Sequence, residues 1–448
     1  MSTNKTTYKC TKCDYTTLKW AGYCPNCNEW NSIQEEVIRK SQSNLYSTKK
    51  EPPKLFNLKS IQTQNKSRMS STIKEWDRVL GGGILQGSFL ILTGDPGIGK
   101  STLLLQVANK IAKTNKVIYF SSEESLEQVK TRAMRLNCSC ENLLFSDQAS
   151  LENIITTCIQ EKPNLLILDS IQNCHLEKTD SIPGTTSQLR ETGFELMRLA
   201  KENNIAILVT GHITKDGYMA GPKLLEHMVD GVFYLQGEDQ WQTRILRSVK
   251  NRFGTINEIG FFEMQSRGLV EISDINKHFL SNSTACPGAS LIAYIEGTRP
   301  LILELQSLCV SSKFGIPQRV VSGVNPKQVI LISAILEKYL KVRFSSHDIF
   351  FKVSGNLKIK EHGNDLGIAL ALLSSYFQKP LPEKSISMAE ISLTGQIKPT
   401  TQVDRKTKEA ENFGIKTIFV SQNQQLKTNC KIVKFRNVYE LLNLFPEE

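Results

Sequence analysis

The chain has 448 residues, of which 40% are hydrophobic and 22% charged, so collagen-like, wholly disordered and disulfide-scaffold proteins are excluded. No apolar run approaches the roughly 18 residues of a membrane-spanning helix, and the N-terminus MSTNKTTYKC lacks the apolar core of a secretory signal. The net charge is +11, and residues 1–75 hold 13 Lys and Arg against 6 Asp and Glu. We therefore expect a cytoplasmic protein with no membrane partner. Its basic N-terminal region either binds a polyanion or serves as a solubilising arm.

Four of the eleven cysteines lie within the first 30 residues, as two Cys-x-x-Cys pairs separated by ten residues. Each pair can place two thiolates on one side of a tight turn, and two such turns give tetrahedral sulfur coordination. This spacing favours a structural zinc ion over a redox dithiol pair or iron. We predict a C4-type zinc finger over residues 1–30, whose metal supplies the folding energy. Its expected ligands are Cys10, Cys13, Cys24 and Cys27. The aromatic residues expected to pack against it are Trp20, Tyr23 and Trp30.

Residues 31–55 are polar, include Pro52-Pro53 and are predicted to be a flexible linker. Over residues 56–275, short apolar runs alternate with helical patterns. Runs such as LLILD are apolar on both faces, which predicts an α/β domain with a mostly parallel sheet enclosed by helices. The strands that we expect are Phe89–Thr93, Val117–Ser121, Leu165–Asp169 and Ile205–Thr210.

A P-loop pattern, GDPGIGKS, occupies residues 94–101, between the first of these strands and a helix predicted over Ser101–Lys113. In such loops backbone N–H groups bind phosphate oxygens, and the lysine reaches the β- and γ-phosphates. The hydroxyl that follows the lysine ligates Mg²⁺. We predict a site for ATP with Mg²⁺ in which Lys100 is catalytic. Its predicted nucleotide-binding residues are Gly94, Asp95, Pro96, Gly97, Ile98, Gly99, Lys100, Ser101 and Thr102.

Acidic residues follow two further predicted strands. Asp169 ends the run LLILD, where the second metal partner of a P-loop site belongs, so Ser101 and Asp169 are the predicted magnesium ligands. Glu123 and Glu124 follow VIYFS, at the strand end where α/β sites collect. We expect Glu123 to position the attacking water and hold Glu124 in reserve. Either acid could instead offset a helix dipole, and for Glu124 that role is favoured.

The segment ILVTGHITKDG places Thr210 and His212 at the end of another strand, where they could sense the γ-phosphate. His212 could equally be structural. Two stretches could bind nucleic acid: Gly211–Pro222, with the basic residues Lys215 and Lys223, and residues 180–188. Segments of such composition are often surface loops with no binding role.

The pentapeptide KNRFG, residues 250–254, follows the strand-like RILRSV. On an extended chain, Lys250 and Arg252 point the same way and form a fork suited to a phosphate. In assembled ATPases such a fork can complete a neighbour's site. By spacing alone, a solvent-exposed basic hairpin is the favoured interpretation.

The order of these features resembles the bacterial RadA (Sms) family, whose motifs match GDPGIGKST, SSEESLEQ, LLILDSIQ, GHITKDG and KNRFG after the four-cysteine head. The resemblance implies a RecA- and DnaB-like core in a ring-forming, hexameric, DNA-dependent ATPase. Such an enzyme binds single-stranded and branched DNA and promotes branch migration beside the RecA recombinase in DNA repair. The resemblance also implies that Lys250 and Arg252 act across subunits and in DNA coupling, and it supports Glu123.

The remaining residues, 276–448, form a predicted α+β domain after a break in pattern near 276–290, and they resemble the Lon protease domain. Asp365 stands where that family has its serine nucleophile, and Asp404 stands at the lysine position. A carboxylate cannot replace a hydroxyl nucleophile activated by a lysine, so we expect no proteolysis. The basic residues considered as phosphate contacts here are Arg319, Lys327, Lys358 and Lys360.

Two alternatives to a DNA-translocating ATPase remain from the sequence. A protease or unfoldase would need a Ser–Lys dyad, which the sequence lacks. A nucleotide-gated scaffold would lack Lys100 or Glu123, and both are present.

Overall fold

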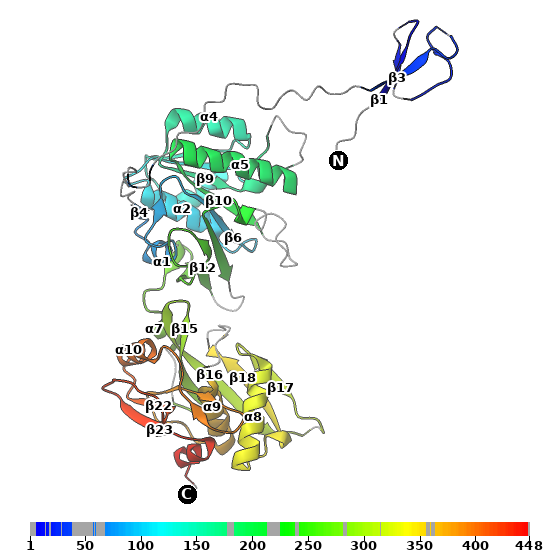
Figure 1. Ribbon diagram of the computed structural model, residues 1–448. Helices are drawn as coiled ribbons and strands as arrows, with labels where there is room; N and C mark the ends of the chain where they lie inside the picture. Colours follow the sequence, from blue (N-terminus) through cyan, green and yellow to red (C-terminus); the bar gives the residue numbers. More distant parts are fainter. Residues whose placement is uncertain are drawn as a thin grey trace. The chain divides into compact units, whose positions relative to one another are not determined.

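The computed structural model describes most of the chain, namely residues 6–13, 15–17, 19–27, 29–37, 57, 59, 68–176, 183–212, 225–237, 242–280, 285–313, 315–354, 359 and 363–446. It divides into two units, Met1–Asn65 and Lys66–Glu448, each of which is considered by itself (Figure 1). No helix in the described part is both long and apolar enough to cross a membrane.

The first unit is a small ribbon of three antiparallel strands in the order β2-β1-β3: β1 (Thr6–Cys10), β2 (Thr16–Thr17) and β3 (Ile33–Val37). The strand β3 was assigned to the linker by the sequence analysis, whereas it pairs with β1 along its whole length, from Cys10↔Ile33 to Thr6↔Val37. Its polar sequence IQEEV concealed it, because so small a ribbon buries little apolar surface and needs no apolar alternation. The ribbon therefore extends beyond the predicted end at residue 30.

The second unit opens with a nine-stranded sheet in the order β14-β13-β12-β11-β6-β10-β9-β7-β8. Six strands from β8 to β11 are mutually parallel, and β12, β13 and β14 are added antiparallel. The strands are β6 (Phe89–Gly94), β7 (Val117–Ser121), β8 (Leu143–Ser146), β9 (Leu165–Asp169), β10 (Ala206–His212), β11 (Gly231–Gly237), β12 (Thr243–Asn251), β13 (Ile259–Gln265) and β14 (Gly268–Glu271). The mostly parallel α/β fold is thus confirmed.

Helices cover both faces of this sheet because successive residues of each central strand point to opposite faces. Leu90 and Leu92 of β6 join the core beneath α1, α2 and α3, whereas Phe89 and Ile91 join the core beneath α4 and α5. The helices are α1 (Lys74–Val79), α2 (Lys100–Ile111), α3 (Leu126–Arg135), α4 (Leu151–Glu161) and α5 (Thr186–Asn203); short elements are β4 (Arg68–Met69), β5 (Ile84–Leu85) and the 3-10 turn η2 (Ile171–Asn173).

The C-terminal part is built on a seven-stranded mixed sheet in the order β17-β18-β16-β15-β19-β22-β23. The helix α9 is buried over 365–375, which explains why its sequence is apolar on every side. The strands of the C-terminal part are β15 (Ala289–Glu296), β16 (Arg299–Ser311), β17 (Arg319–Ser322), β18 (His347–Val353), β19 (Ser385–Met388), β22 (Thr417–Ser421) and β23 (Lys431–Phe435), together with β20 (Glu390–Ile391) and β21 (Ile397–Lys398), which pair with each other. Its helices are α7 (Ile275–Leu280), α8 (Pro326–Leu340), α9 (Asp365–Phe377) and α10 (Val403–Phe413), with the 3-10 elements η3 (Phe344–Ser346) and η5 (Val438–Leu444).

The sequence predicts a break in pattern near 276–290, whereas the structure has a short helix, α7, at the start of this stretch. α7 places Ile275 and Leu280 in the same core as the C-terminal sheet. A six-residue helix is shorter than two turns and shows no helical periodicity in the sequence, so it escaped the prediction.

Buried polar contacts join the nine-stranded and seven-stranded parts within this unit. Glu75 of α1 is 3% exposed and forms an ion pair with Arg299 of β16 at 2.6 Å. Glu75 also accepts a hydrogen bond from the backbone N–H of Phe261 at 2.9 Å, and the Arg299 guanidinium lies 5.1 Å from the centre of the Phe261 ring. A second ion pair joins Arg247 of β12 to Glu296 of β15.

Candidate nucleotide site and metal centre

The P-loop connects the C-terminal end of β6 to α2, in the centre of the parallel strands. Gly94 has φ 154°, and a Cβ atom there would lie 2.2 Å from the carbonyl oxygen of Leu235, so the close approach of β11 requires glycine. Gly97 has φ 74°, and among the described residues no atom outside its chain neighbours lies within 4 Å of the position that its Cβ would take. The hydroxyl of Thr93, just before the loop, is buried without a hydrogen-bond partner in the described part. A glycine-rich loop with open space beside Gly97, at the N-terminus of a helix, fits a phosphate group.

Lys100 begins α2 and is buried beneath the loop. Its Nζ donates hydrogen bonds to the carbonyl oxygens of Gly94 at 2.8 Å and Asp95 at 3.0 Å. Burial lowers the pKa of Lys100, and the charges of Asp169, Glu123 and Asp95 oppose that shift. The ammonium thus lies in the electrostatic field of both predicted acids.

Asp169 ends β9 with its carboxylate held from two strands. Its Oδ1 accepts a hydrogen bond from Thr210 Oγ1 at 2.6 Å, and its Oδ2 accepts one from Tyr119 Oη at 2.7 Å. Burial raises the pKa of Tyr119 well above its usual value, and Asp169 adds to the effect, so the phenol remains a neutral donor. A carboxylate oriented in this way can ligate a divalent cation directly or through water.

The two consecutive glutamates after β7 face different partners. Glu123 accepts a hydrogen bond from Ser170 Oγ, which directly follows Asp169. Glu124 forms an ion pair with Arg132 of α3 instead. Glu123 is therefore the acid of this pair that is directed toward the strand ends where Asp169 and Lys100 lie.

Several side chains that support the site were missed by the sequence analysis. Tyr119 and Ser170 orient the acids, and Arg244 of β12 donates a hydrogen bond from Nε to the P-loop carbonyl of Ile98 at 3.2 Å. Met264 of β13 packs behind the loop, where a Cβ on Gly99 would approach its Cε to 2.6 Å. The tyrosine could have been found, since a phenol inside the buried run VIYFS needs a polar partner.

The strand β10 passes beside the P-loop, with His212 in register with Gly94 and Thr210 bonded to Asp169. The His212 side chain and residues 213–224, which include Lys215 and Lys223, lie outside the described residues, as do residues 180–182 of the second candidate loop.

The KNRFG turn begins with the last two residues of β12, at the opposite end of the sheet from the P-loop. Lys250 pairs with Val232 near the start of β11, and Gly231 of that strand is in register with Leu90. The P-loop instead begins at Gly94, the last residue of β6, which is four residues and therefore about 13 Å farther along at the usual rise of a strand. The two cations of the turn therefore do not belong to the nucleotide site formed by the same chain's P-loop.

Both cations contact the segment 225–230. Lys250 Nζ donates to the carbonyl oxygen of Glu226, and Arg252 lies 3.6 Å from the buried Asp230 carboxylate while remaining 60% exposed in its side chain. Asp230 also receives hydrogen bonds from Lys201 Nζ at 2.6 Å and the backbone N–H of Phe89 at 3.0 Å.

Arg68 fixes the KNRFG turn from its other side. Its guanidinium donates to the carbonyl oxygens of Phe253, Leu80 and Gly83, at 2.6, 3.4 and 3.3 Å. One planar side chain thus ties the turn to the end of α1, a role that the sequence gives no means of recognising.

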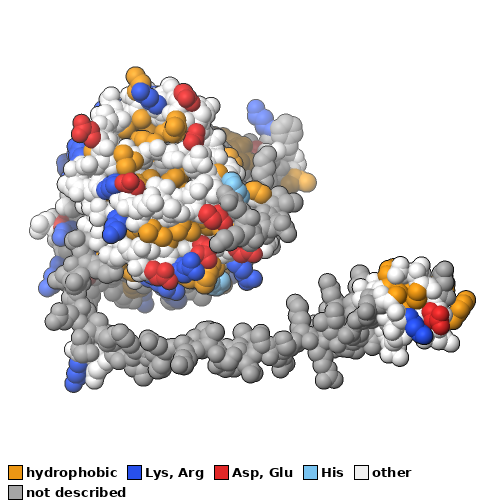
Figure 2. Space-filling view, turned by 90° about the horizontal axis from the view of Figure 1, so that it is seen from above, with side chains coloured by type: hydrophobic (Ala, Val, Ile, Leu, Met, Phe, Trp, Pro, Cys, Tyr) orange, Lys and Arg blue, Asp and Glu red, His pale blue; other side chains and the backbone are white. Residues whose placement is uncertain are grey.

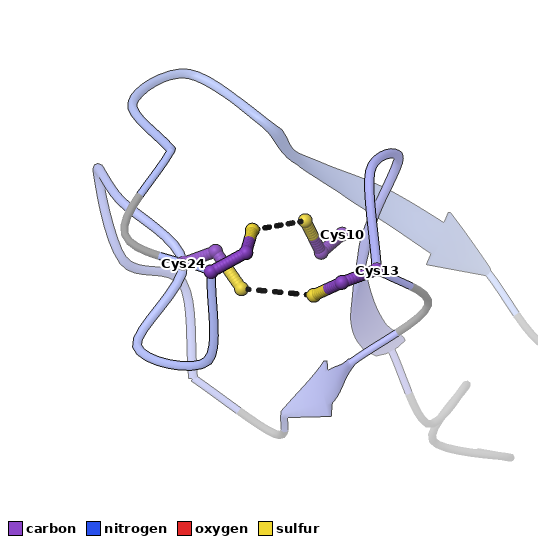
Figure 3. Close-up of side chains that lie close together, drawn as sticks. Cys10, Cys13 and Cys24 are labelled. Atoms are coloured by element: carbon purple, nitrogen blue, oxygen red, sulfur yellow. Dashed lines mark hydrogen bonds between the residues drawn. The ribbon is translucent and has the colours of Figure 1, made fainter.

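The four predicted zinc ligands meet in the ribbon (Figure 3). All four sulfur atoms lie within 4.8 Å of one another, with Cys10–Cys27 at 3.7 Å and Cys13–Cys24 at 3.5 Å. Tetrahedral zinc with Zn–S bonds of about 2.3 Å separates its sulfurs by about 3.8 Å. Backbone and amide donors also point at two of the sulfurs, from Lys12 N to Cys10 and from Asn26 to Cys13. The side-chain hydrogen bond with Ser32 lowers the pKa of Cys10 to about 6. The site fits a structural zinc ion.

The aromatic residues of the ribbon do not pack against the metal as expected. Trp20, Tyr23 and Trp30 are 66%, 45% and 74% exposed. A site with four thiolate ligands buries its own centre with those thiolates and their tight turns, so no large side chain is needed there.

Elsewhere all seven other cysteines are unbridged, and burial raises the pKa of Cys158 and Cys174 to about 12, which makes them inert thiols.

The C-terminal residues expected from the protease resemblance lie in different environments. Asp365 is buried at the start of α9, where it accepts hydrogen bonds from Gln328 Nε2 at 2.6 Å and Ile391 N at 3.0 Å. Asp404 is exposed on α10. Arg319 donates to three backbone carbonyls, of Gln318, Phe344 and His347. Lys327 is exposed, and the other two candidate lysines, Lys358 and Lys360, lie outside the described residues.

Three family models match successive parts of the chain. Residues 8–35 match a rubredoxin metal binding domain, residues 52–218 an AAA domain, and residues 318–424 the subunit ChlI of Mg-chelatase. Together with the site geometry, they give a zinc ribbon followed by an ATP-hydrolysing core that works with Mg²⁺.

Relatives match nearly the whole chain. The DNA repair protein RadA of Listeria monocytogenes is 42% identical, over 96% of this chain and 94% of its own length. The DNA repair protein RadA of Aquifex aeolicus is 38% identical, over 95% and 96%. A solved structure of the RadB recombinase is 21% identical and covers 46% of this chain and 100% of its own, with a TM-score of 0.37. On the strength of the two full-length relatives, the chain belongs to the family of the DNA repair protein RadA.

Proposed function

We propose that the protein is a DNA-dependent ATPase that processes recombination intermediates during DNA repair in the cytoplasm. It would bind single-stranded and branched DNA and promote branch migration beside the RecA recombinase, as a ring of six copies. The observation that carries this proposal is the placement of two complementary half-sites at opposite ends of one sheet. Lys100, Glu123 and Asp169 gather at one end, and the basic KNRFG turn lies at the other.

The nucleotide half-site has the groups that phosphoryl transfer needs. The P-loop N–H groups and Lys100 would hold the phosphates, Ser101 and Asp169 would hold Mg²⁺, and Glu123 would orient the attacking water. When bound, MgATP supplies the phosphoryl group that is transferred and the metal charge that stabilises it. Lys100 already has its ammonium buried under the loop, so little reorganisation is required.

The basic turn has the properties of a group that acts on another copy. Arg252 is exposed, is oriented by Asp230, and lies too far from its own P-loop to contact a phosphate there. Head-to-tail assembly would place it against the next subunit's site, and such an assembly forms a ring when the rotation between subunits closes. Lys250 would couple that contact to DNA.

The C-terminal part lacks the groups that proteolysis would need at the position of the expected nucleophile. At the start of α9 the residue is Asp365, whose two oxygens already accept hydrogen bonds from Gln328 and Ile391. A paired, buried carboxylate is not a hydroxyl nucleophile, so we propose that this part is proteolytically inactive.

The decisive experiment measures ATP hydrolysis by the purified chain with and without single-stranded DNA at two salt concentrations. We expect DNA to stimulate turnover and the stimulation to fade with salt, because phosphate contacts release counterions. The Lys100→Ala chain serves as the control for a contaminating ATPase. Hydrolysis that is indifferent to DNA would contradict the proposal and favour a nucleotide-gated scaffold.

A further inference from the structure

Arg244 of β12 differs from the cations that lie at the surface of the second unit. On the face shown in Figure 2, Lys and Arg side chains lie among Asp and Glu side chains. Arg244 is instead half-buried, and two backbone carbonyl oxygens accept hydrogen bonds from its guanidinium. Nε donates to Ile98 of the P-loop at 3.2 Å, and Nη1 donates to Thr243 at 3.1 Å. These two contacts fix the plane of the guanidinium, since its donors have a rigid planar arrangement.

The side chain of Arg244 crosses one strand to reach the P-loop. The sheet order is β12-β11-β6, so the strand that carries Arg244 is two strands, or about 10 Å, from the strand that leads into the loop. Gly237 of β11 is in register with Arg244. A Cβ on Gly237 would lie 3.1 Å from Nε of Arg244 and 2.3 Å from Cδ1 of Ile98. The missing side chain at position 237 therefore gives the arginine a path to the loop.

The hydrogen bond from Arg244 fixes the direction of a P-loop N–H group. The carbonyl of Ile98 and the N–H of Gly99 belong to one peptide group, which is planar and trans, so the two bonds point in opposite directions. A donor that holds the carbonyl thus sets the direction of the N–H. Within the described part of the chain this N–H has no hydrogen-bond acceptor, and P-loop N–H groups are the ones that bind phosphate oxygens. A charged donor on the carbonyl also polarises the peptide, which strengthens the N–H as a donor.

Two further strands hold the same peptide from its glycine side. A Cβ on Gly99 would lie 2.6 Å from Cε of Met264 on β13 and 3.4 Å from Cδ1 of Leu269 on β14. Gly99 has φ 111°, in the left-handed region that favours glycine. The three antiparallel strands β12, β13 and β14 therefore each contribute a side chain beside the peptide that joins Ile98 to Gly99, although the sequence motif of the loop lies entirely outside them.

We propose that Arg244 is a positioning residue for the phosphates of ATP, because it holds the Ile98 carbonyl so that the Gly99 N–H is directed at a phosphate oxygen before nucleotide binds. This inference deepens the proposed function and rests on its nucleotide site. Lys100 is expected to contact the phosphates itself, whereas Arg244 acts through the backbone of the loop. The antiparallel strands then serve nucleotide binding as well as extending the sheet.

The test uses the full, zinc-loaded chain with a fluorescent MgADP analogue, which is displaced by either MgADP or magnesium pyrophosphate. Pyrophosphate has the phosphates without the base and ribose. Arg244→Met should weaken both competitors by the same factor, about tenfold, because the loop loses one oriented N–H donor. Arg244→Lys should weaken them as much, since a lysine ammonium does not reproduce two donors in a fixed plane. Arg267→Met, which removes an exposed arginine bonded to Gln265, is the matched control and should change neither affinity.

Chemical rescue separates positioning from a merely structural role. In Arg244→Ala, added ethylguanidinium supplies the part of the side chain that the substitution removes and should restore most of the affinity for both competitors. Ethylammonium at the same concentration should not. Gly237→Val covers the case in which the Arg244 variants do not fold. It keeps the arginine but blocks its path, so both competitors should bind more weakly and ethylguanidinium should have no effect.

Three results would overturn the inference. Unchanged affinity for pyrophosphate in both Arg244→Met and Gly237→Val would show that the contact does not direct the N–H. Weaker binding of MgADP alone would place Arg244 at the base or the ribose. Full affinity in Arg244→Lys would assign it a direct charge contact with the phosphates. Failure of the proposed function looks different: the unmodified chain would then bind no MgADP analogue or would show no turnover response to DNA.

Discussion

At the scale of single residues, the nucleotide site combines the buried Lys100 and Asp169 with the exposed Glu123, and each of the three already has hydrogen-bond partners before any ligand binds. Asp169 is paired on both oxygens, Glu123 is bonded to Ser170, and Lys100 donates to two carbonyls. These hydrogen bonds explain how the charges of Lys100 and Asp169 can be buried at the end of a parallel sheet. Burial of the charge should still destabilise the fold at Lys100, because the nearby acidic charges only partly offset the loss of hydration of its ammonium.

We predict that Lys100→Met abolishes hydrolysis without unfolding the chain. Because burial lowers the pKa of Lys100 in the folded state, the charged ammonium opposes folding below that pKa. This penalty disappears as the pH rises from the lowered pKa to the unfolded value of about 10.4. The gap between the unfolding midpoints of the two chains should therefore change over this pH range and be constant below it. Retained turnover by the variant would contradict the assignment.

Glu123 and Glu124 provide a matched pair of substitutions. Glu123→Gln should reduce turnover by about a hundredfold or more while ATP binding is retained, because the amide cannot accept a proton from water. Glu124→Gln removes only a partly exposed ion pair with Arg132 and should alter stability by about 1 kcal/mol or less. Single-turnover hydrolysis and nucleotide titration separate the two effects. Equal losses in both variants would show that the roles are not divided in this way.

At the scale of elements, the KNRFG turn is a hairpin loop fixed by its neighbours rather than a free basic loop. Asp230 and Arg68 hold it from two sides, and Asn251 donates to the carbonyl of Val79 at 3.5 Å. A turn built in this way presents Arg252 in a defined direction, which is what a contact with a neighbouring subunit requires.

A mixing experiment tests that contact. Lys100→Ala chains lack a working P-loop and Arg252→Ala chains lack the proposed finger, so each should be inactive alone. In mixed assemblies, some sites combine an intact P-loop with an intact arginine from the neighbour, and turnover should partly return. Activity that never exceeds the sum of the two separate preparations would contradict action between subunits. Chains carrying both substitutions provide the control.

The zinc ribbon should behave as an independent element. Cys24→Ser removes one of four thiolates and should release one zinc ion per chain, measured by atomic absorption. Since the ribbon and residues 66–448 are separate units, the main melting transition should not move. Zinc content equal to that of the unmodified chain would contradict the assignment of ligands.

The elements that the sequence predicted are those with a strong local signal. β7 and β9 begin and end as expected, because each consists of four consecutive hydrophobic residues followed by a polar residue at the strand end. The ribbon strand β3 escaped because it is polar, and α7 because it is short. Arg68, Tyr119 and Asp230 escaped for a different reason: their partners are distant in sequence, and only the fold brings them together. The packing of Trp20, Tyr23 and Trp30 against the metal was predicted wrongly, because composition cannot show which way a side chain faces.

At the scale of the whole molecule, the second unit is joined across its two sheets by buried polar contacts. Glu75 and Arg299 are both largely removed from solvent, and the pair is surrounded by Phe261 and its backbone. A buried ion pair adds little net stability, whereas removing one partner leaves an uncompensated charge.

We predict that Arg299→Ala destabilises the unit by about 3–5 kcal/mol because it strands the Glu75 carboxylate. The double variant Glu75→Gln/Arg299→Met should recover most of that loss. Denaturant unfolding measures both, and Lys277→Ala, which removes an exposed pair with Asp274, is the control. If the single and double variants are equally destabilised, packing rather than charge dominates this contact.

The hairpin between β15 and β16 also reaches the loop that carries Arg252. The last residues of that loop, Asn257 and Glu258, are bonded to Thr298 at 3.1 and 2.7 Å, and a Cβ on Gly297 would lie 1.6 Å from the Asn257 oxygen. The loop is therefore clamped at its first residue by Asp230 and at its last by the C-terminal part. These contacts connect the loop that carries Arg252 directly to the hairpin of the seven-stranded sheet. Position 297 admits glycine alone, because any larger residue would push the loop away from the hairpin and break that mechanical linkage.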